Sequence, residues 1–137
     1  MRLLVDTNVF LDLFYNRPNL VENSKNFFLR SRIMQDEIYI SSTTMKDLAY
    51  FLKKLLHDNK KVNDKLVNLY AKINKVISTT ADDCINALYE DGDYEDNILF
   101  ESAERTMCDA IITRNIKHFA QKQIKCWTPD DYLKFRN

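Results

Sequence analysis

The stretch Leu3-Leu4-Val5-Asp6 is an apolar run that ends on an acid, and Thr7-Asn8 and a helix-like run follow it at once. This pattern predicts a buried β-strand over residues 2–6 that delivers the Asp6 carboxylate to one edge of a sheet. In open α/β folds, ligands bind at the edge where the parallel strands end. A functional site built around Asp6 is therefore the leading hypothesis.

The composition is that of a globular protein with no overall attraction to nucleic acid. The chain has 137 residues, of which 45% are hydrophobic and 29% are charged, and its formal net charge is zero. This length predicts one domain, residues 1–137. Any contact with nucleic acid must then come from a local basic patch. The single glycine argues against a turn-rich all-β fold and excludes a glycine-rich phosphate loop.

The three cysteines indicate a reducing compartment. Cys84, Cys108 and Cys126 are widely spaced, and no C-x-x-C pair occurs. Such cysteines are typical of cytoplasmic proteins rather than of disulfide frameworks or structural zinc sites. The apolar start is too short for a secretion signal, and no apolar stretch is long enough to span a bilayer. We therefore expect a cytoplasmic protein without membrane association.

Strand-like and helix-like segments alternate along the chain, which predicts α/β layers around a mainly parallel sheet. Besides residues 2–6, strands are expected at residues 38–40, 76–78, 110–113 and 124–127. Helices are expected at about residues 20–32, 60–72, 79–89, 94–106 and 116–121, and from the hydroxyl-rich residues 41–44 to about residue 57. Pro129 is expected to open a terminal helix.

Asp6 and Asp47 each have a second interpretation as helix caps. Asp6 precedes a helix-like run, but Thr7 or Asn8 could cap that helix in its place, which favours a site role for Asp6. Asp47 lies three residues after Thr44 and suits a capping box with Asp in place of Glu. For Asp47 the two interpretations are compatible, and both stay open.

Asp96 and Asp109 stand beside two other expected elements. Asp96 begins an inward-facing stripe that continues with apolar residues at i+3, i+4 and i+7. A carboxylate directed at the interior is costly unless it is paired or bound to a metal. Because Asp93 and Glu95 can cap this helix, Asp96 is free for a site role. Asp109 precedes the strand at 110–113, where it is either a strand-edge charge or a supporting ligand.

Converging carboxylates would repel one another and recruit a cation. Two unit charges about 5 Å apart repel by roughly 3 kcal/mol at an effective dielectric of about 20. Three or four of them would therefore take up protons or bind a positive ion. Oxygen ligands without His or Cys suit Mg²⁺ or Mn²⁺. In an acidic cleft such an ion activates water and neutralises charge on a phosphodiester.

Four segments of the chain form a recognisable set, with V-D-T-N near the start and I-I-T-R-N-x-x-x-F near the end. The segments are Leu4–Asn8, Ile40–Leu48, Tyr94–Asp96 and Cys108–Asn115, with Phe119 after them. From residue 2 to about residue 130 this set resembles PIN-domain proteins, a family of metal-dependent ribonucleases that includes many bacterial toxins of toxin–antitoxin pairs. The resemblance implies a three-layer α/β/α sandwich with a mainly parallel central sheet of four to five strands.

The resemblance also implies roles for the acids. Asp6, Asp47 and Asp96 would bind Mg²⁺ or Mn²⁺ or hold metal-bound water, and the shorter reach of Asp47 favours contact through water. Asp109 would be the available fourth catalytic acid. The family usually has Glu where this chain has the shorter Asp47. It often has an acid where this chain has the neutral Asn115.

Polar and basic residues near the acids complete the expected site. Hydrogen-bonding side chains would position the acids or a phosphate, although ordinary turn capping is an alternative. These supporting residues are Thr7, Asn8, Thr113 and Asn115. The expected RNA-binding cations are Arg114 and Lys117. His57 and His118 stand alone in the sequence and are not assigned as general bases.

These assignments predict a Mg²⁺- or Mn²⁺-dependent endoribonuclease in which Asp6 and Asp96 anchor the ion and Asp47 orients the attacking water. In a toxin, an antitoxin protein would cover the cleft and an apolar groove. The groove is expected along Phe10, Phe14, Phe27 and Phe28, which as an alternative form core or a homodimer surface.

Two other functions stay open. One is a PIN-like module with weak or no catalysis that binds nucleic acid or protein, which the shortened Asp47 and the neutral Asn115 motivate. The other is a phosphoryl-transfer domain of the receiver or haloacid-dehalogenase type. The haloacid-dehalogenase pattern requires a second acid where this chain has Asn8, and Thr113-Arg114 does not supply the late lysine of a receiver.

Overall fold

The apolar run that opens the chain forms the middle strand of a five-stranded parallel sheet. The computed structural model describes residues 1–137, and the strand order is β3-β2-β1-β4-β5. The strands are β1 (Arg2–Val5), β2 (Glu37–Ser41), β3 (Lys75–Ile77), β4 (Ala110–Ile112) and β5 (Lys125–Trp127). In the register, Leu4 of β1 lies opposite Tyr39 of β2 and Ile111 of β4.

Helices connect the successive strands, as parallel pairing requires. They are α1 (Thr7–Phe14), α2 (Val21–Ile33), α3 (Ser42–Leu56), α4 (Asn59–Tyr70), α5 (Ala81–Ala87), α6 (Tyr94–Arg105), the 3₁₀ helix η1 (Ile116–Phe119) and α7 (Pro129–Phe135). Pro129 opens α7 as predicted, with a capping box between Thr128 and Asp131. The strands and helices therefore lie where the sequence places them, within a few residues at their ends.

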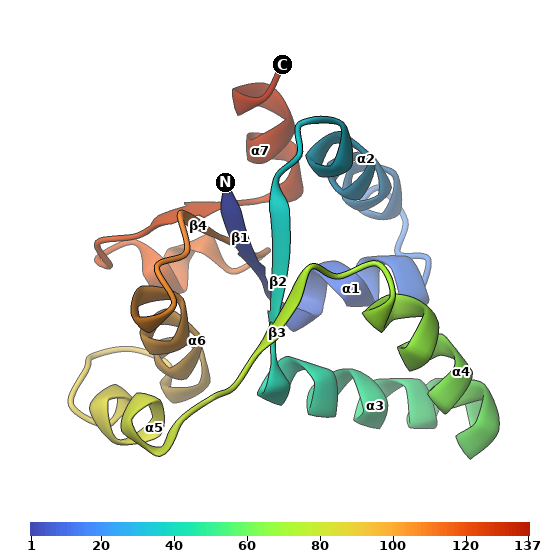
Figure 1. Cartoon of the computed structure of the whole chain (residues 1–137), viewed down its shortest axis with the longest axis horizontal. Coiled ribbons are helices and arrows are strands. Elements are labelled where there is room, and N and C mark those ends of the chain that lie inside the picture. Colours follow the sequence, from blue (N-terminus) through green and yellow to red (C-terminus); the bar gives the residue numbers. More distant parts are fainter.

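Both faces of the sheet are buried, which gives three layers. Side chains alternate along β1, so Leu3 and Val5 join one core while Leu4 joins the other. The first core also contains residues of α1, α2, α3 and α7, and the second contains residues of α6 and η1. Figure 1 shows α1–α4 on one side of the sheet and α5 and α6 on the other, which confirms the three-layer α/β/α prediction.

The path of the chain makes β1 a switch point. After β1 the chain adds β2 and β3 on one side and then crosses to add β4 and β5 on the other. In parallel sheets, a crevice opens at the carboxyl ends of the strands where the winding direction reverses. The carboxyl end of β1, which Asp6 follows, therefore lies at this switch point, beside the end of β4.

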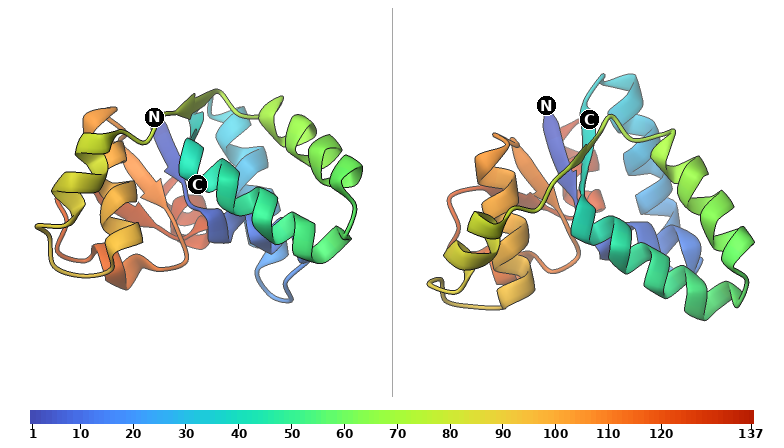
Figure 2. Two further views of the ribbon diagram at one scale, coloured as in Figure 1. Left: turned by 90° about the horizontal axis from the view of Figure 1, so that it is seen from below. Right: turned by 60° about the horizontal axis from the view of Figure 1, so that its bottom comes forward.

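Two further features complete the architecture. The helices α3 and α4 pack against each other and extend away from the sheet as a pair (Figure 2). None of the helices combines the length and the apolar composition that crossing a membrane requires.

Phe27 is the test of the first core. Its side chain is fully buried and packs edge-on against Phe28 and Tyr132. We expect Phe27→Ala to lower the free energy of unfolding by about 3–5 kcal/mol, because it leaves a cavity between α2 and α7. Leu29→Ala, on the exposed side of the same helix, should change it by less than about 0.5 kcal/mol. Urea denaturation checks both values, and equal stability of the two variants would contradict this packing.

Candidate active site

The Asp6 carboxylate is held at the carboxyl edge of the sheet by three donors. Its Oδ1 accepts from the backbone N–H of Thr7 at 2.7 Å. Its Oδ2 accepts from Asn8 Nδ2 at 2.9 Å and from the Thr113 hydroxyl at 2.7 Å. Asp6 is also the N-cap of α1, which confirms the capping interpretation and is compatible with a site role.

Asp6 holds its proton unusually strongly for a carboxyl group. Burial raises its pKa from 3.8 to about 6, although the three hydrogen bonds act in the opposite direction. The negative charge of Asp96 raises the pKa further. Asp6 and Asp96, which the sequence separates widely, are thus close enough for one charge to affect the other.

The predicted supporting residues lie around Asp6 in two different roles. Asn8 and Thr113 donate through their side chains, and they also contact each other at 3.3 Å. Thr7 and Asn115 act through their backbone N–H groups, which bind Asp6 Oδ1 and Thr113 Oγ1. Asn8 Oδ1 accepts from the backbone N–H of Arg114 at 3.0 Å, which ties α1 to the segment after β4.

Asp96 lies in the first turn of α6 and contacts a histidine that sequence reasoning did not assign. Its backbone N–H binds the N-cap Asp93 at 3.0 Å, as expected. Its Oδ2 contacts Nδ1 of His118, which comes from η1. Burial raises the pKa of Asp96, and the His118 hydrogen bond opposes that shift. The only sequence signal for His118 was its place just after the T-R-N segment.

Asp47 does not form the predicted capping box. The N-cap of α3 is Ser41, whose hydroxyl accepts from the backbone N–H of Thr44, and Asp47 therefore lies beyond the first turn. Asp47 is exposed and its carboxylate makes no hydrogen bond or ion pair, while desolvation by the surrounding protein raises its pKa. Asp47 is therefore not a helix cap, and its carboxylate is available to a ligand.

Asp109 lies at the opposite edge of the sheet, so the structure does not bring it to the other acids. It precedes β4, whereas Asp6 follows β1, and the two strands run parallel. Its Oδ2 accepts from the backbone N–H of Arg2 at 2.7 Å, where β1 begins. The expectation that Asp109 replaces the missing fourth acid was wrong, because a residue that precedes a parallel strand lies at the edge opposite to the carboxyl ends. The alternative interpretation of Asp109 as a strand-edge charge agrees with its contact to Arg2.

Arg114 is a structural cation rather than a free one. Its Nε donates to Asp12 Oδ2 at 2.9 Å, and its guanidinium also reaches Ser24 and Asp130. Asp12 is fully buried, and 14% of the Arg114 side chain is exposed. The predicted RNA-binding role of Arg114 therefore conflicts with its contacts. Lys117 is exposed beside His118 and stays available.

The donor set fits a hard dication that keeps much of its water. No three His, Cys, Asp or Glu side chains lie close enough together to hold one ion alone. A carboxylate offers about four lone-pair sites, of which Asp6 uses three and Asp96 one. Mg²⁺ in proteins is commonly bound by one or two carboxylates and several waters. Asp6 and Asp96 are therefore the residues that could hold such an ion directly.

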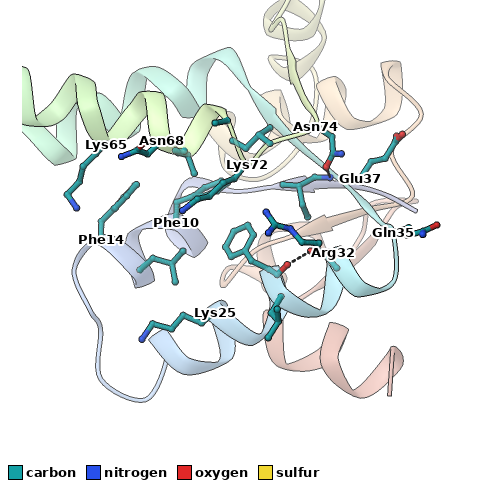
Figure 3. Close-up of a pocket in the computed structure, with 18 residues that line it drawn as sticks. Phe10, Phe14, Lys25, Arg32, Gln35, Glu37, Lys65, Asn68, Lys72 and Asn74 are labelled. Atoms are coloured by element: carbon teal, nitrogen blue, oxygen red, sulfur yellow. Dashed lines mark hydrogen bonds between the residues drawn. The ribbon is translucent and has the colours of Figure 1, made fainter.

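A separate groove of about 940 Å³ lies beside the first core, between α2 and α4 (Figure 3). Phe10, Phe14 and Phe28 line it, and Phe27 does not. Phe10 and Phe27 are both fully buried in the first core, as the alternative interpretation expected. Half of the 18 lining residues are hydrophobic. Three of the four phenylalanines predicted to line a groove therefore do line this one.

Cations dominate the rim of this groove. Lys25 and Arg32 come from α2, and Lys65 and Lys72 come from α4 and the turn after it (Figure 3). Glu37 is the only acidic residue of the lining. The groove therefore combines an apolar floor with a positive rim.

Together, these features define an α/β/α protein with aspartates gathered at the carboxyl edge of a parallel sheet. The chain belongs to the PIN-domain family, whose model matches residues 2–117. No curated protein matches the chain.

Several solved structures share this fold. The chain is 18% identical to the matched chain of VapBC2 from Rickettsia felis, bound to a promoter DNA fragment, with a TM-score of 0.69 and coverage of 92% of this chain and 97% of that one. A toxin–antitoxin complex from Klebsiella pneumoniae gives 23% identity, a TM-score of 0.63 and coverage of 92% and 96%. VapC20 of Mycobacterium tuberculosis, a sarcin–ricin-loop-cleaving toxin, gives 12% identity, a TM-score of 0.65 and coverage of 88% of this chain and 95% of that one.

The pH dependence of stability tests the environment of Asp6. The folded state holds this proton more tightly than the unfolded chain, because the pKa is raised to about 6. Its stabilising contribution is therefore complete below about pH 4 and is lost as the pH rises through 6. We expect the stability of the wild type relative to Asp6→Asn to fall by about 3 kcal/mol across that range. Denaturation in a chelating buffer measures this difference, and a constant difference would contradict the raised pKa.

Arg114→Ala distinguishes a structural cation from an RNA contact. The substitution leaves Asp12 buried without its closest cation, and we expect a loss of about 3 kcal/mol in the free energy of unfolding. Lys117→Ala, an exposed cation in the same segment, should cost less than about 0.5 kcal/mol. Chemical denaturation provides the measurement. Weaker RNA binding by Arg114→Ala with unchanged stability would restore the RNA-binding assignment.

Proposed function

We propose that this protein is a divalent-metal-dependent endoribonuclease that hydrolyses RNA phosphodiesters at the Asp6–Asp96 edge. The observation that carries the proposal is a buried carboxyl group with a pKa of about 6 at the switch point of the sheet, within the electrostatic influence of a second carboxylate. Membership of the PIN-domain family supports it. The fold similarity to a toxin described as cleaving the sarcin–ricin loop supports RNA as the substrate class.

Each acid has a distinct task in this proposal. Asp6 and Asp96 would hold Mg²⁺ or Mn²⁺, and Thr113 and Asn8 fix the orientation of Asp6. Asp47, which has no protein partner, would orient the attacking water. The bound ion would supply activation of that water and neutralisation of the phosphodiester charge. Lys117 is the nearby free cation for the RNA backbone.

Cleavage of single-stranded RNA in the presence of Mn²⁺ tests the assignment. We expect Asp96→Asn and Asp47→Asn to lower the cleavage rate by about 100-fold or more, because charge stabilisation by the ion contributes several kcal/mol. Asp109→Asn is the matched control, since it makes the same change at the opposite edge of the sheet. Its rate should equal that of the wild type. Equal rates for Asp96→Asn and the wild type would end the nuclease proposal.

A binding module with little or no catalysis is the second candidate. The neutral Asn115 and the absence of any cluster of three potential ligands favour it. Calorimetry with Mn²⁺ separates the two functions, because the nuclease requires an ion at the acidic edge. No heat of binding in the millimolar range would favour the binding module.

We also propose that the protein is the toxin of a toxin–antitoxin pair and that the antitoxin occupies the α2–α4 groove. The similar structures include VapBC2, FitAB and a further toxin–antitoxin complex. The apolar floor suits the hydrophobic face of a peptide, and the rim of Lys25, Arg32, Lys65 and Lys72 suits acidic residues on that peptide. Two copies of this toxin in one assembly are a further proposal.

Charge reversal in the groove tests the antitoxin site. We expect Lys65→Glu with Lys72→Glu to weaken binding of the protein encoded by an adjoining small gene by at least about tenfold, which is roughly 1.4 kcal/mol. RNA cleavage should be unchanged. Lys60→Glu with Lys61→Glu makes the same charge change on α4 outside the groove and should not affect binding. Equal loss of binding in both pairs would contradict the groove as the site.

A further inference from the structure

Only one side chain contacts the carboxylate of Asp96 through a hydrogen bond. It is His118, whose Nδ1 contacts Asp96 Oδ2. The Asp93 side chain binds the backbone N–H of Asp96 and does not orient the carboxylate. Asp6, by contrast, is held by three donors. The Asp96 carboxylate therefore has one hydrogen-bond partner to fix its orientation, whereas the Asp6 carboxylate has three.

The chemistry of the contact fixes the direction of the hydrogen bond. An ionised carboxylate can only accept, so Nδ1 of His118 must carry the proton. The neutral imidazole then has its lone pair on Nε2, and the second oxygen of Asp96 stays open to another ligand. This arrangement has the form of an outer-shell partner that orients a ligating carboxylate.

His118 is placed by the same segment that holds Asp6. Thr113 donates to Asp6 at the start of this segment, and His118 donates to Asp96 near its end. Between them, the His118 backbone N–H binds the Asn115 carbonyl at 3.1 Å. Phe119 is buried in the second core with Leu99 of α6, which anchors η1 beside the helix that carries Asp96. Residues 113–118 thus span the two carboxylates.

The contact between His118 and Asp96 is not needed to stabilise the fold. The His118 side chain is 48% exposed, and the N-terminus of α6 is already capped by Asp93. Leu99 and Ala103 hold α6 against the sheet without it. Loss of an exposed imidazole should therefore leave the fold intact and change only what Asp96 does.

We propose that His118 is a positioning residue of the acidic edge, whose Nδ1–H holds the Asp96 carboxylate in the orientation that receives a divalent cation. The proposal rests on the proposed metal-dependent function and adds a residue to it. Outer-shell partners of this kind change metal affinity or activity by about 10–100-fold when they are removed.

Three variants of the full chain test this role. His118→Ala removes the donor, whereas His118→Asn keeps an N–H at nearly the position of Nδ1. His57→Asn is the matched control, because His57 is the only other histidine and its left-handed backbone, with φ of 53°, tolerates Asn. Calorimetry with Mn²⁺ on protein stripped of metal provides a readout that does not depend on cleavage.

We expect His118→Ala to bind Mn²⁺ at least about tenfold more weakly than the wild type. His118→Asn should bind Mn²⁺ within about threefold of the wild type, because the retained N–H donor keeps the orientation of Asp96. His57→Asn should also bind it within about threefold of the wild type, because it leaves His118 unchanged. Wild-type affinity in His118→Ala would overturn the positioning role, and so would equal loss in His118→Asn and His118→Ala. A wild type that neither binds Mn²⁺ nor cleaves RNA would instead remove the proposed function itself.

Nitrogen NMR of the metal-free His57→Asn protein gives an independent check. This variant has a single imidazole, so its two ring nitrogens need no assignment. At a pH at which the nitrogen shifts show the single imidazole to be neutral, we expect Nδ1 to be protonated and Nε2 to be bare. A proton on Nε2 instead would overturn the proposal without any metal being present.

Discussion

The hydrogen bond from the Thr113 hydroxyl to Asp6 is the interaction on which the acidic edge depends. It joins the ends of β1 and β4, the two strands that meet where the winding of the sheet reverses. At that point the crevice is built into the topology, but a carboxylate buried there is costly without donors. Thr113, together with Asn8 and the first N–H of α1, supplies those donors and so permits a charged group where a ligand can reach it.

The same short segment ties this edge to the core beneath α2. Arg114, next to Thr113, donates its backbone N–H to Asn8 and its guanidinium to the buried Asp12. Because Ser24 of α2 also binds Asp12, at 2.7 Å, one polar network runs from the acids into the first helical layer. A disturbance of Arg114 would therefore affect both stability and the geometry around Asp6, and only measurements of both can separate the two effects.

The fold was predictable from sequence because its signals are local. Apolar runs ended by polar residues marked the strands, and Pro129 and the hydroxyl-rich residues 41–44 marked helix starts that the structure contains. The site was predictable only in part. Asp6 and Asp96 follow from strand ends and helix stripes, but the contacts of Arg114 and His118 join residues that are far apart in the chain. Asp109 was misassigned because it precedes a parallel strand, which places it at the edge opposite to the carboxyl ends where Asp6 lies.

The energetics of Asp6 connect the apo fold to the proposed activity. Its pKa near 6 means that ionisation at neutral pH weakens the fold, and the neighbouring charge of Asp96 adds to that cost. A dication that binds only the folded, ionised form would reverse both effects, since ligand binding to the native state adds stability by mass action. The acidic edge would therefore be more stable with a bound dication than without one, and a chain with zero net charge offers no general field that would have the same effect. In the role proposed here, Asp96 would supply the second carboxylate for that ion, and its contact with His118 would fix the orientation of the carboxylate.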